Sequence, residues 1–500
     1  MKRITWLLAL FILTAGALHA TDGTRMVGFS ALTIGRGGAA IGVFDGPSLM
    51  MTNPAGISFL SGSSLEGGMS LLVPGVKFTN ALNNDVAGKT NYFPLPDLGY
   101  VRRQEGNDFT WGVGAFTQGG MGADFTLNHN LFRNATGGFD QQQYHSKLAV
   151  MQGGVSAAYK LSPQFSVGAS AHLVYGQMEF TMPYSLAPSA MQGVINPATG
   201  MTFGDMFAGP PAAGGFGYTE VTAGAAMNDL SAFGFSGKVG LAYKVNENVT
   251  LGLCYTSPTA LTFKNGNATM DMTAQFNDAF GKAVQGYMAQ NPSASPIEAQ
   301  QAVAGQFAGL GIDLSKGVVA HYNMQAKLTM PQSIGLGAGY RASDNLLLAL
   351  DLEWVNWKNA FDQMTLSLSN GDNANINRML GNSGALSLAF PLDWKDSYCV
   401  RVGGEYRASS LLTVRAGYAY GSNPVPASTI FPVFPAIVEN HVTVGASYKV
   451  SDPLTVHAAV ELALNKKETA SAQSIVAQEY DGSISQLSES VFHLTLSWSL

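Results

Sequence analysis

The sequence predicts an all-β fold, a transmembrane antiparallel β-barrel, and three observations lead to this prediction. Charged residues make up 12% of the chain, about half the share that soluble proteins carry. After the N-terminal leader, no apolar run reaches the roughly 18 residues that a membrane helix needs, so membrane-spanning helices are not expected. Segments with an apolar residue at every second position recur along the chain, as in strands that face lipid on one side.

Residues 1–20 have the features of a secretory signal peptide. Lys2 and Arg3 give a positive start, residues 4–17 form an apolar run, and Ala20 fits the last residue before cleavage. No cysteine follows Ala20 directly, which argues against a lipid anchor on the mature N-terminus.

Short turns of one kind recur between the expected strands. Each consists of a tyrosine, a basic residue and a few polar residues, followed by an apolar strand start. The tyrosine ring would lie at the membrane surface, with its apolar body toward lipid and its hydroxyl toward water. Five copies with similar spacing favour such a girdle over a common soluble hairpin, and they begin at Tyr159, Tyr243, Tyr340, Tyr406 and Tyr448.

Apolar and polar residues alternate in the strands next to these turns. Residues 442–450, 454–462 and 492–500 each place apolar side chains on one face and polar ones on the other. A soluble sandwich would bury the apolar face, whereas a membrane barrel would turn it outward. Alternation alone does not distinguish them, but the leader, the low charge and the tyrosine girdle favour the barrel. The charged residues on the polar face are then expected to form ion pairs in the lumen, and they are Lys238, Asp351, Glu353, Arg401, Glu405, Arg415 and Glu461.

Two long regions lack the strand pattern. Residues 181–232 are rich in Gly, Ala, Met and Pro, and residues 265–325 contain helix-like stretches. Long loops of a barrel belong on the extracellular side. These loops could catch hydrophobic molecules or only shield the rim, and the sequence leaves both interpretations open.

Residues 21–62 precede the first expected strand and do not alternate. Their glycines permit tight packing and a positive φ, and Asn53-Pro54-Ala55-Gly56 is a turn signal. We expect this segment to fold inside the barrel, which residues 63–500 would form, as a hatch that plugs the lumen.

Several functions are not expected from the composition. The net charge of −6 argues against nucleic acid as a partner. No cluster of His, Cys and carboxylate residues has the spacing of metal ligands, so neither a metal nor another cofactor is expected. The histidines are scattered and lie outside any Gly-x-Ser-x-Gly motif, which argues against an enzyme. Cys254 and Cys399 fall in expected strands and could form a disulfide or remain two free thiols.

Three segments together resemble the FadL-type outer-membrane transporters of long-chain fatty acids and aromatic hydrocarbons. Residues 28–57 resemble the hatch of that family, residues 328–361 resemble its proline-then-strand pattern, and residues 394–428 resemble a later hairpin with Pro-Val-Pro. The resemblance covers nearly the whole chain and implies a barrel of about 14 strands, plugged by the hatch. It also implies hatch or gating roles for Phe29, Asn53, Pro54, Ala55 and Gly56.

The function that this resemblance implies is the passive uptake of hydrophobic compounds, either long-chain fatty acids or hydrocarbons. The ligand would be captured among the loops, pass a hatch that moves, and leave sideways into the membrane, without a cofactor. The expected partners are hydrophobic small molecules and the lipid or lipopolysaccharide of the outer membrane, and a monomer is expected. A general porin or an adhesin-type barrel is the alternative, and an outer-membrane lipase is less favoured.

Fatty-acid importers of this family place basic residues near the carboxylate of the ligand. Their register puts these positions at Gln177 and Phe390, which are uncharged, and this would favour neutral compounds because an unpaired buried carboxylate is costly. Lys264, Lys327 or Arg133 could supply a cation instead.

Overall fold

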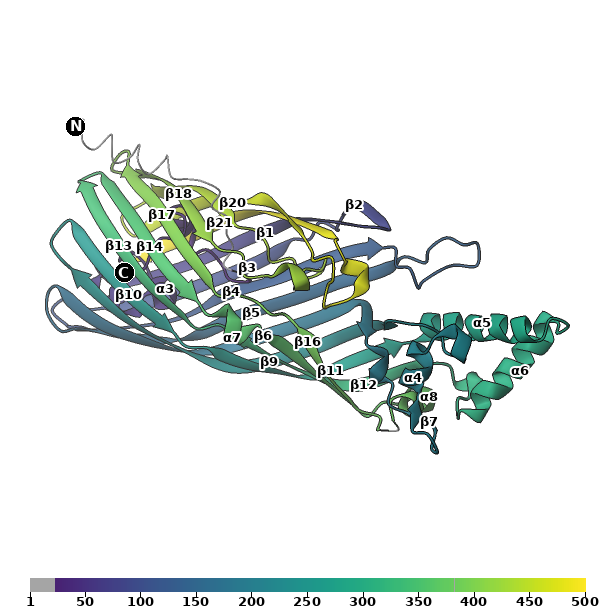
Figure 1. The fold of residues 1–500 in the computed structure, drawn as a ribbon. Coiled ribbons are helices and arrows are strands. Elements are labelled where there is room, and N and C mark those ends of the chain that lie inside the picture. Colours follow the sequence, from purple (N-terminus) through teal and green to yellow (C-terminus); the bar gives the residue numbers. More distant parts are fainter. Residues whose placement is uncertain (1–22, 382) are drawn as a thin grey trace.

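The computed structural model describes residues 23–381 and 383–500, so the expected signal peptide lies outside the described part of the chain. Nineteen strands of the described chain form one antiparallel sheet, which closes on itself because β21 pairs with β1 (Figure 1). These strands cross the membrane fourteen times. Four of the crossings consist of two strands each, and β2 (Asn83–Ala87) only extends a hairpin from β1. The predicted barrel is confirmed.

Single strands make most of the crossings. They are β1 (Ser64–Asn80), β3 (Phe93–Arg103), β4 (Phe109–Leu127), β5 (Gln142–Lys160), β6 (Phe165–Leu186), β9 (Val221–Lys244), β18 (Leu412–Gly421), β19 (Asn440–Lys449), β20 (Leu454–Thr469) and β21 (Ile484–Ser499). The broken crossings are β10 (Val249–Thr256) with β11 (Thr259–Asp271), β13 (Ser333–Ser343) with β12 (Val319–Met330), β14 (Leu346–Val355) with β15 (Gln363–Ser369), and β17 (Ser397–Arg407) with β16 (Leu386–Pro391). Pro258 and Pro331 stand at two of these breaks, where proline removes the N–H that a continuous ladder would need.

The periodicity of the wall is inverted relative to that of a soluble protein. On β19, Val442 and Val444 are 41% and 55% exposed, whereas Thr443 between them is 1% exposed. On β21, Phe492 is exposed and His493 next to it is buried. An apolar outer face and a polar inner face are typical of a barrel in lipid. The tyrosines of the expected girdle are exposed as well, namely Tyr159, Tyr243, Tyr340, Tyr406 and Tyr448.

Both long loops are shorter than predicted, which corrects their bounds. The loop expected at 181–232 spans 187–220, between β6 and β9, and the loop expected at 265–325 spans 272–318, between β11 and β12. The strand ends were missed because β-bulges shift the alternation there. One of them contains Asp229, which has a φ of 59°.

Both loops contain helices, although helix-like stretches were expected only in the second. α4 (Phe203–Ala208) lies in the first loop, and α5 (Thr273–Gln290) and α6 (Pro296–Gly309) form a helical hairpin that projects from the end of the barrel (Figure 1). A capping box of Ser295 and Glu298 fixes the start of α6. None of the helices in the described chain is long and apolar enough to cross a membrane. The shorter elements are α7 (Trp357–Ala360), α8 (Ala374–Met379), β7 (Val194–Asn196), β8 (Met201–Thr202), η2 (Pro188–Ala190), η3 (Pro211–Ala213), η4 (Leu314–Lys316), η5 (Ala427–Thr429) and η6 (Gln478–Tyr480).

Residues 23–62, here called the hatch segment, lie inside the barrel. The segment contains α2 (Ala31–Ile34), α3 (Leu49–Thr52) and η1 (Pro54–Phe59), which are almost wholly buried. Its backbone comes very close to glycines on the inner face of the wall. A Cβ on Gly337 would lie 2.4 Å from the nitrogen of Gly42, and a Cβ on Gly168 would lie 2.5 Å from the nitrogen of Ala55. Glycine at these wall positions therefore lets the segment pack tightly in the lumen.

Candidate functional site

Three cavities of the described chain follow one another from the extracellular end of the lumen to the wall. The entrance cavity, with about 820 Å³ of empty space, lies between the end of β6, Asp362, Asp393 and residues 475–476. The aromatic cavity, with about 390 Å³, shares Phe390 with it. The wall cavity, with about 970 Å³, shares Leu148 with the aromatic cavity.

The aromatic cavity forms because residues 422–439 turn inward instead of extending the wall. Four prolines in this stretch disfavour a strand. Phe431 from it lies 5.3 Å from Phe390 and 6.2 Å from Phe180, measured between ring centroids, and Tyr184 stacks on Phe390 at 6.0 Å. The rings give the cavity an apolar lining that suits a hydrophobic molecule.

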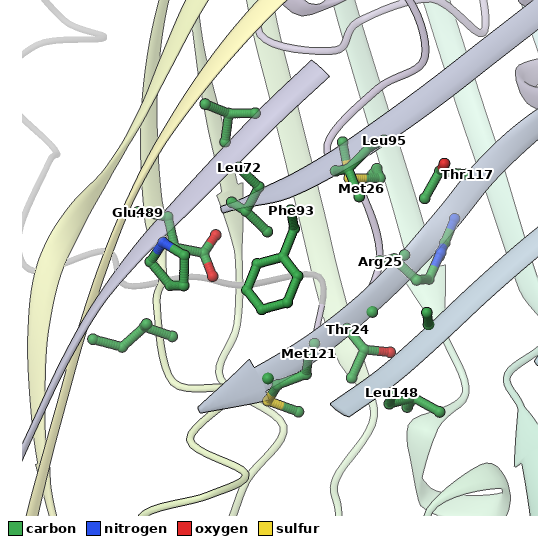
Figure 2. Close-up of a pocket in the computed structure, with 18 of the residues that line it drawn as sticks. Thr24, Arg25, Met26, Leu72, Phe93, Leu95, Thr117, Met121, Leu148 and Glu489 are labelled. Atoms are coloured by element: carbon green, nitrogen blue, oxygen red, sulfur yellow. The ribbon is translucent and has the colours of Figure 1, made fainter. Parts of the chain in front are cut away.

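The wall cavity lies where β3 and β4 separate. Their ladder ends at the pair Asp97 and Phe116, although β3 continues along β1 as far as Phe93. β4 bulges at the same height, because its register with β5 shifts at Gln118. Phe93 and Met121 project into the space between the separated strands (Figure 2). The cavity thus adjoins an interruption in the hydrogen bonding of the wall.

At this interruption the hatch segment takes the place of β3 as the partner of β4. Arg25 and Gly119 form an antiparallel bridge, flanked by backbone hydrogen bonds of 3.2 and 2.9 Å. A Cβ on Gly119 would lie 2.0 Å from the carbonyl oxygen of Thr24, so this approach requires glycine. Unpaired backbone groups are costly inside a membrane, and the bridge satisfies part of the edge that β3 leaves open.

Buried charges tie the middle of the hatch segment to the wall. The fully buried Arg36 pairs with Asp45 at 2.5 Å and with Glu405 at 3.2 Å. Asp351 accepts two backbone N–H groups of the segment at 2.7 and 2.9 Å. Lumen ion pairs were expected for both wall residues; Glu405 forms one, whereas Asp351 has no cationic partner within the described residues, so the ion pair expected for it is wrong. The further pairs are Arg25–Glu353, Arg401–Glu353 and Arg415–Glu405, each at 2.8 Å.

Lys238, Cys254 and Cys399 are buried residues of the barrel wall. Lys238 donates to Thr256 Oγ1 at 2.8 Å and has no carboxylate partner within the described chain, so the ion pair expected for it is wrong. Cys254 and Cys399 are both buried and are not joined by a disulfide, which decides against that alternative. Within residues 23–381 and 383–500, no group of His, Cys, Asp and Glu side chains could hold a metal ion.

Asn53 joins two parts of the hatch segment to the wall. Its Nδ2 donates to the carbonyl oxygens of Ile41 and Leu241, both at 2.9 Å, and its Oδ1 accepts the N–H of Ala55 at 3.3 Å. The side chain is fully buried. It therefore satisfies polar groups that water does not reach.

The other expected hatch residues pack around it. Pro54 opens η1, a position where the missing N–H costs nothing, and Ala55 is fully buried. A Cβ on Gly56 would lie 2.6 Å from the ring of Phe44. Phe29 meets Phe116 edge-to-face at 6.2 Å. None of these residues lines the three cavities, and their role in gating stays a prediction.

Replacing Asn53 by alanine should lower the free energy of unfolding by about 1–3 kcal/mol, because buried partners lose their hydrogen bonds. Urea unfolding of the protein in detergent micelles or vesicles would measure this. Asn323→Ala, at an exposed position of β12, is the matched control and should change stability by less than about 0.5 kcal/mol. Equal effects of the two substitutions would contradict the assigned role.

Three of the four expected ligand residues lie outside the lumen, which corrects their assignment. Gln177, Lys264 and Lys327 are exposed on the outer faces of β6, β11 and β12, and Gln177 donates to the hydroxyl of Tyr175 at 3.0 Å. The alternation is intact at Gln177 and Lys327. Lys264 lies in a β-bulge between Phe263 and Gly266, but it is exposed there and does not turn inward. Phe390 is 1% exposed and lines both the entrance and the aromatic cavity, and its role in ligand binding stays a prediction.

The wall cavity has a polar end that was not expected from the sequence. His441 Nδ1 and Glu461 Oε1 lie 2.7 Å apart there, and Glu489 lines the same cavity. Glu489 shares the inner face of β21 with Leu487 and Val491. The alternation of β21 in the sequence therefore predicts that Glu489 faces the lumen.

A carboxyl group at the extracellular end holds residues 470–483 against the barrel. The hydroxyl of Tyr144 donates to Glu479 Oε2 at 2.6 Å, and His129 Nε2 lies 3.8 Å from the same oxygen. Burial raises the pKa of Glu479 to about 7, and burial lowers the pKa of His129 to about 4. His129 is therefore neutral when Glu479 ionises, and the nearby Glu220 adds a repelling charge.

The attachment of residues 470–483 should weaken as the pH rises. A detached Glu479 ionises near its ordinary pKa of about 4.3, whereas the buried one stays protonated to about 7, so the packed state loses stability between these values. Proteolysis of this loop should be faster at pH 8 than at pH 5 after correction for protease activity. Glu479→Gln should remove the dependence, while Glu298→Gln in the exposed start of α6 should not. A rate that is independent of pH in the unmodified protein would argue against this attachment.

The chain matches the family described as outer membrane protein transport protein (OMPP1/FadL/TodX) over residues 15–497. The chain belongs to this family. The family consists of transport channels, so this FadL-type protein is an outer-membrane protein that transports hydrophobic compounds, and it is not an enzyme. The resemblance noted in the sequence is confirmed. No curated protein sequence matches the chain.

Solved structures with the same fold include three members of this family. The Pseudomonas putida toluene transporter TodX is 19% identical, with 95% of this chain and 99% of that chain covered at a TM-score of 0.66. A Pseudomonas aeruginosa FadL homologue is 18% identical, with 96% and 100% covered at 0.67. The Ralstonia pickettii toluene transporter TbuX is 19% identical, with 94% and 98% covered at 0.62. At these identities the likeness establishes the fold.

Proposed function

We propose that this FadL-type protein takes up hydrophobic compounds passively, captures them at the entrance cavity and releases them sideways between β3 and β4. Release occurs when residues 24–26 leave β4. One observation carries the proposal. The series of cavities ends at the place where the hatch segment, and not β3, is the partner of β4.

The lining of the path explains why no energy source is required. Removing apolar surface from water gains about 25 cal/mol per Å². A compound that buries about 200 Å² would therefore gain about 5 kcal/mol on entering the aromatic cavity. A sideways exit leads from this apolar lining to lipid without a return to water, whereas an exit through the periplasmic end would require one. Movement down a concentration gradient is then sufficient.

The contact that closes the path is weak enough to open spontaneously. It includes two backbone hydrogen bonds, each worth about 0.5–1.5 kcal/mol, and the ion pair of Arg25 with Glu353. A total of a few kcal/mol leaves an open state populated at about 0.1–10%. The bulk of the hatch segment is held by Arg36, Asp351 and Asn53 and can stay in place.

Locking the start of the hatch segment to β4 should block transport. In the double variant Met26→Cys and Gln118→Cys, a disulfide would join residues that are linked by a backbone hydrogen bond of 3.2 Å. Uptake of a hydrocarbon such as toluene into proteoliposomes should fall about tenfold or more on oxidation and recover on reduction. Each single variant is the control, since the native cysteines are buried and form no disulfide. Unchanged uptake by the oxidised double variant would reject this gate.

The general porin and the adhesin-type barrel remain alternatives to transport of this kind, and conductance separates the first of them. The buried hatch segment should keep the barrel closed in planar bilayers, and deletion of residues 21–62 should produce a steady open pore. A steady pore in the unmodified protein would favour the porin instead. An adhesin would leave the aligned cavities without a purpose.

A further inference from the structure

The wall cavity combines a long apolar lining with one acidic end. Leu72, Phe93, Leu95, Met121 and Leu148 line it, and they come from β1, β3, β4 and β5 on both sides of the interruption (Figure 2). The acidic end consists of Glu461 and Glu489, together with His441. An amphiphilic ligand would find a place for its tail and a place for its head in this one cavity.

The basic side chains that line the wall cavity are already paired with carboxylates of the protein. Arg25 pairs with Glu353 at 2.8 Å, and Lys147 pairs with Glu179 at 3.2 Å. His441 is 2.7 Å from Glu461, as described above. A carboxylate on a ligand would therefore enter a site whose positive charges are occupied.

Glu489 differs from the other charged residues of the wall cavity because its carboxylate is unpaired within the described residues. It makes no hydrogen bond and no ion pair with any residue in 23–381 and 383–500. Its carboxylate points into the cavity beside Phe93 (Figure 2). Its cross-strand neighbours are Pro74, which has no N–H, and Ala463, which has no polar side chain. Covering this carboxylate with a purely apolar molecule would leave it without a hydrogen-bond donor, which is costly.

The entrance cavity shows the same preference in its charges. Asp362 and Asp393 line it, and no Lys or Arg does. The aromatic cavity between the two has an almost entirely apolar lining, with Phe390 at its centre. An anionic head group would be repelled at both ends of this path, whereas a hydroxyl or an ammonium group would find acceptors.

We propose that the wall cavity binds hydrophobic compounds with a hydrogen-bond-donating head group, a hydroxyl or a protonated amine, and that Glu489 accepts the hydrogen bond of that head. This inference rests on the transport proposed above and adds a substrate class to it. Glu461 is positioned by His441 and contributes negative charge, while Glu489 makes the contact. The apolar residues on both sides of the interruption hold the tail.

Binding of four ten-carbon probes tests this site. Decanol, decylamine, decane and decanoate would be compared by equilibrium dialysis at a fixed detergent concentration, with protein-free micelles as the reference. We expect decanol and decylamine to bind about tenfold more tightly than decane, and decanoate to bind most weakly. The two donor probes separate a hydroxyl from a charged amine as the preferred head.

The variant Glu489→Gln should lower binding of decanol and decylamine about tenfold, with the larger loss for decylamine, and leave decane unchanged. Glu66→Gln is the matched control, because Glu66 is another buried inner-face carboxylate, which Ser497 engages at 3.0 Å outside the wall cavity. Decanoate binding as tight as decanol binding in the unmodified protein would overturn the proposal. So would an equal effect of Glu489→Gln on all four probes.

Uptake of decane into proteoliposomes separates this inference from the proposed function. Absence of uptake would reject the transport route, while the order of binding would still decide the acidic site. Uptake of decane together with equal binding of all four probes would keep the route and reject the acidic site.

Discussion

Every backbone N–H and C=O group of a wall that faces lipid has to find its partner within the protein, because lipid offers none. Most of the barrel meets this requirement with continuous antiparallel ladders. Two of the broken crossings meet it with proline, which has no N–H to leave unpaired. Where β3 separates from β4, the hatch segment supplies the partner, through the bridge of Arg25 and Gly119. The interruption of the wall and the start of the hatch segment are thereby one structure.

The hatch segment is attached with very different strength along its length. Its middle is held by the buried Arg36, by two N–H groups on Asp351 and by the side chain of Asn53. Each of these contacts involves a charge or a buried amide, whose loss costs more than that of an exposed contact. The contacts of its beginning include the backbone bridge to Gly119 and the ion pair of Arg25 with Glu353. The proposed release, in which only the first residues of the hatch segment move, relies on this difference.

The sequence predicts the barrel well because the face of a strand residue is a local property. Alternation on β19 and β21 and the repeated tyrosines depend only on near neighbours in the chain. The assignment of Gln177 failed for a related reason, since an error of one residue in register moves a side chain to the opposite face. Lys264 and Lys327 were chosen for their charge alone, and both lie on the outer face. The loop bounds failed where bulges such as that at Asp229 interrupt the alternation.

The pairing of Arg25 with Gly119 had no comparable signal. It joins positions far apart in the chain through backbone atoms, and only the absence of a side chain at Gly119 marks it. Glu489 was detectable by its parity, but whether an inner carboxylate is paired depends on three-dimensional neighbours. Both features lie at the wall cavity, where the structure departs from a regular barrel.

A site on a transport path must hold its ligand well enough to select it and weakly enough to release it, as in channels that conduct through successive weak sites. A hydrogen bond to a charged group contributes about 1.5–3 kcal/mol, which is a factor of about ten to a hundred in residence. The surface of the bilayer offers phosphate oxygens that accept the same hydrogen bond. The head group therefore exchanges Glu489 for an equivalent acceptor as it leaves, while its tail passes from one apolar surrounding to another. On these terms an acidic end in the wall cavity selects a head group without trapping it.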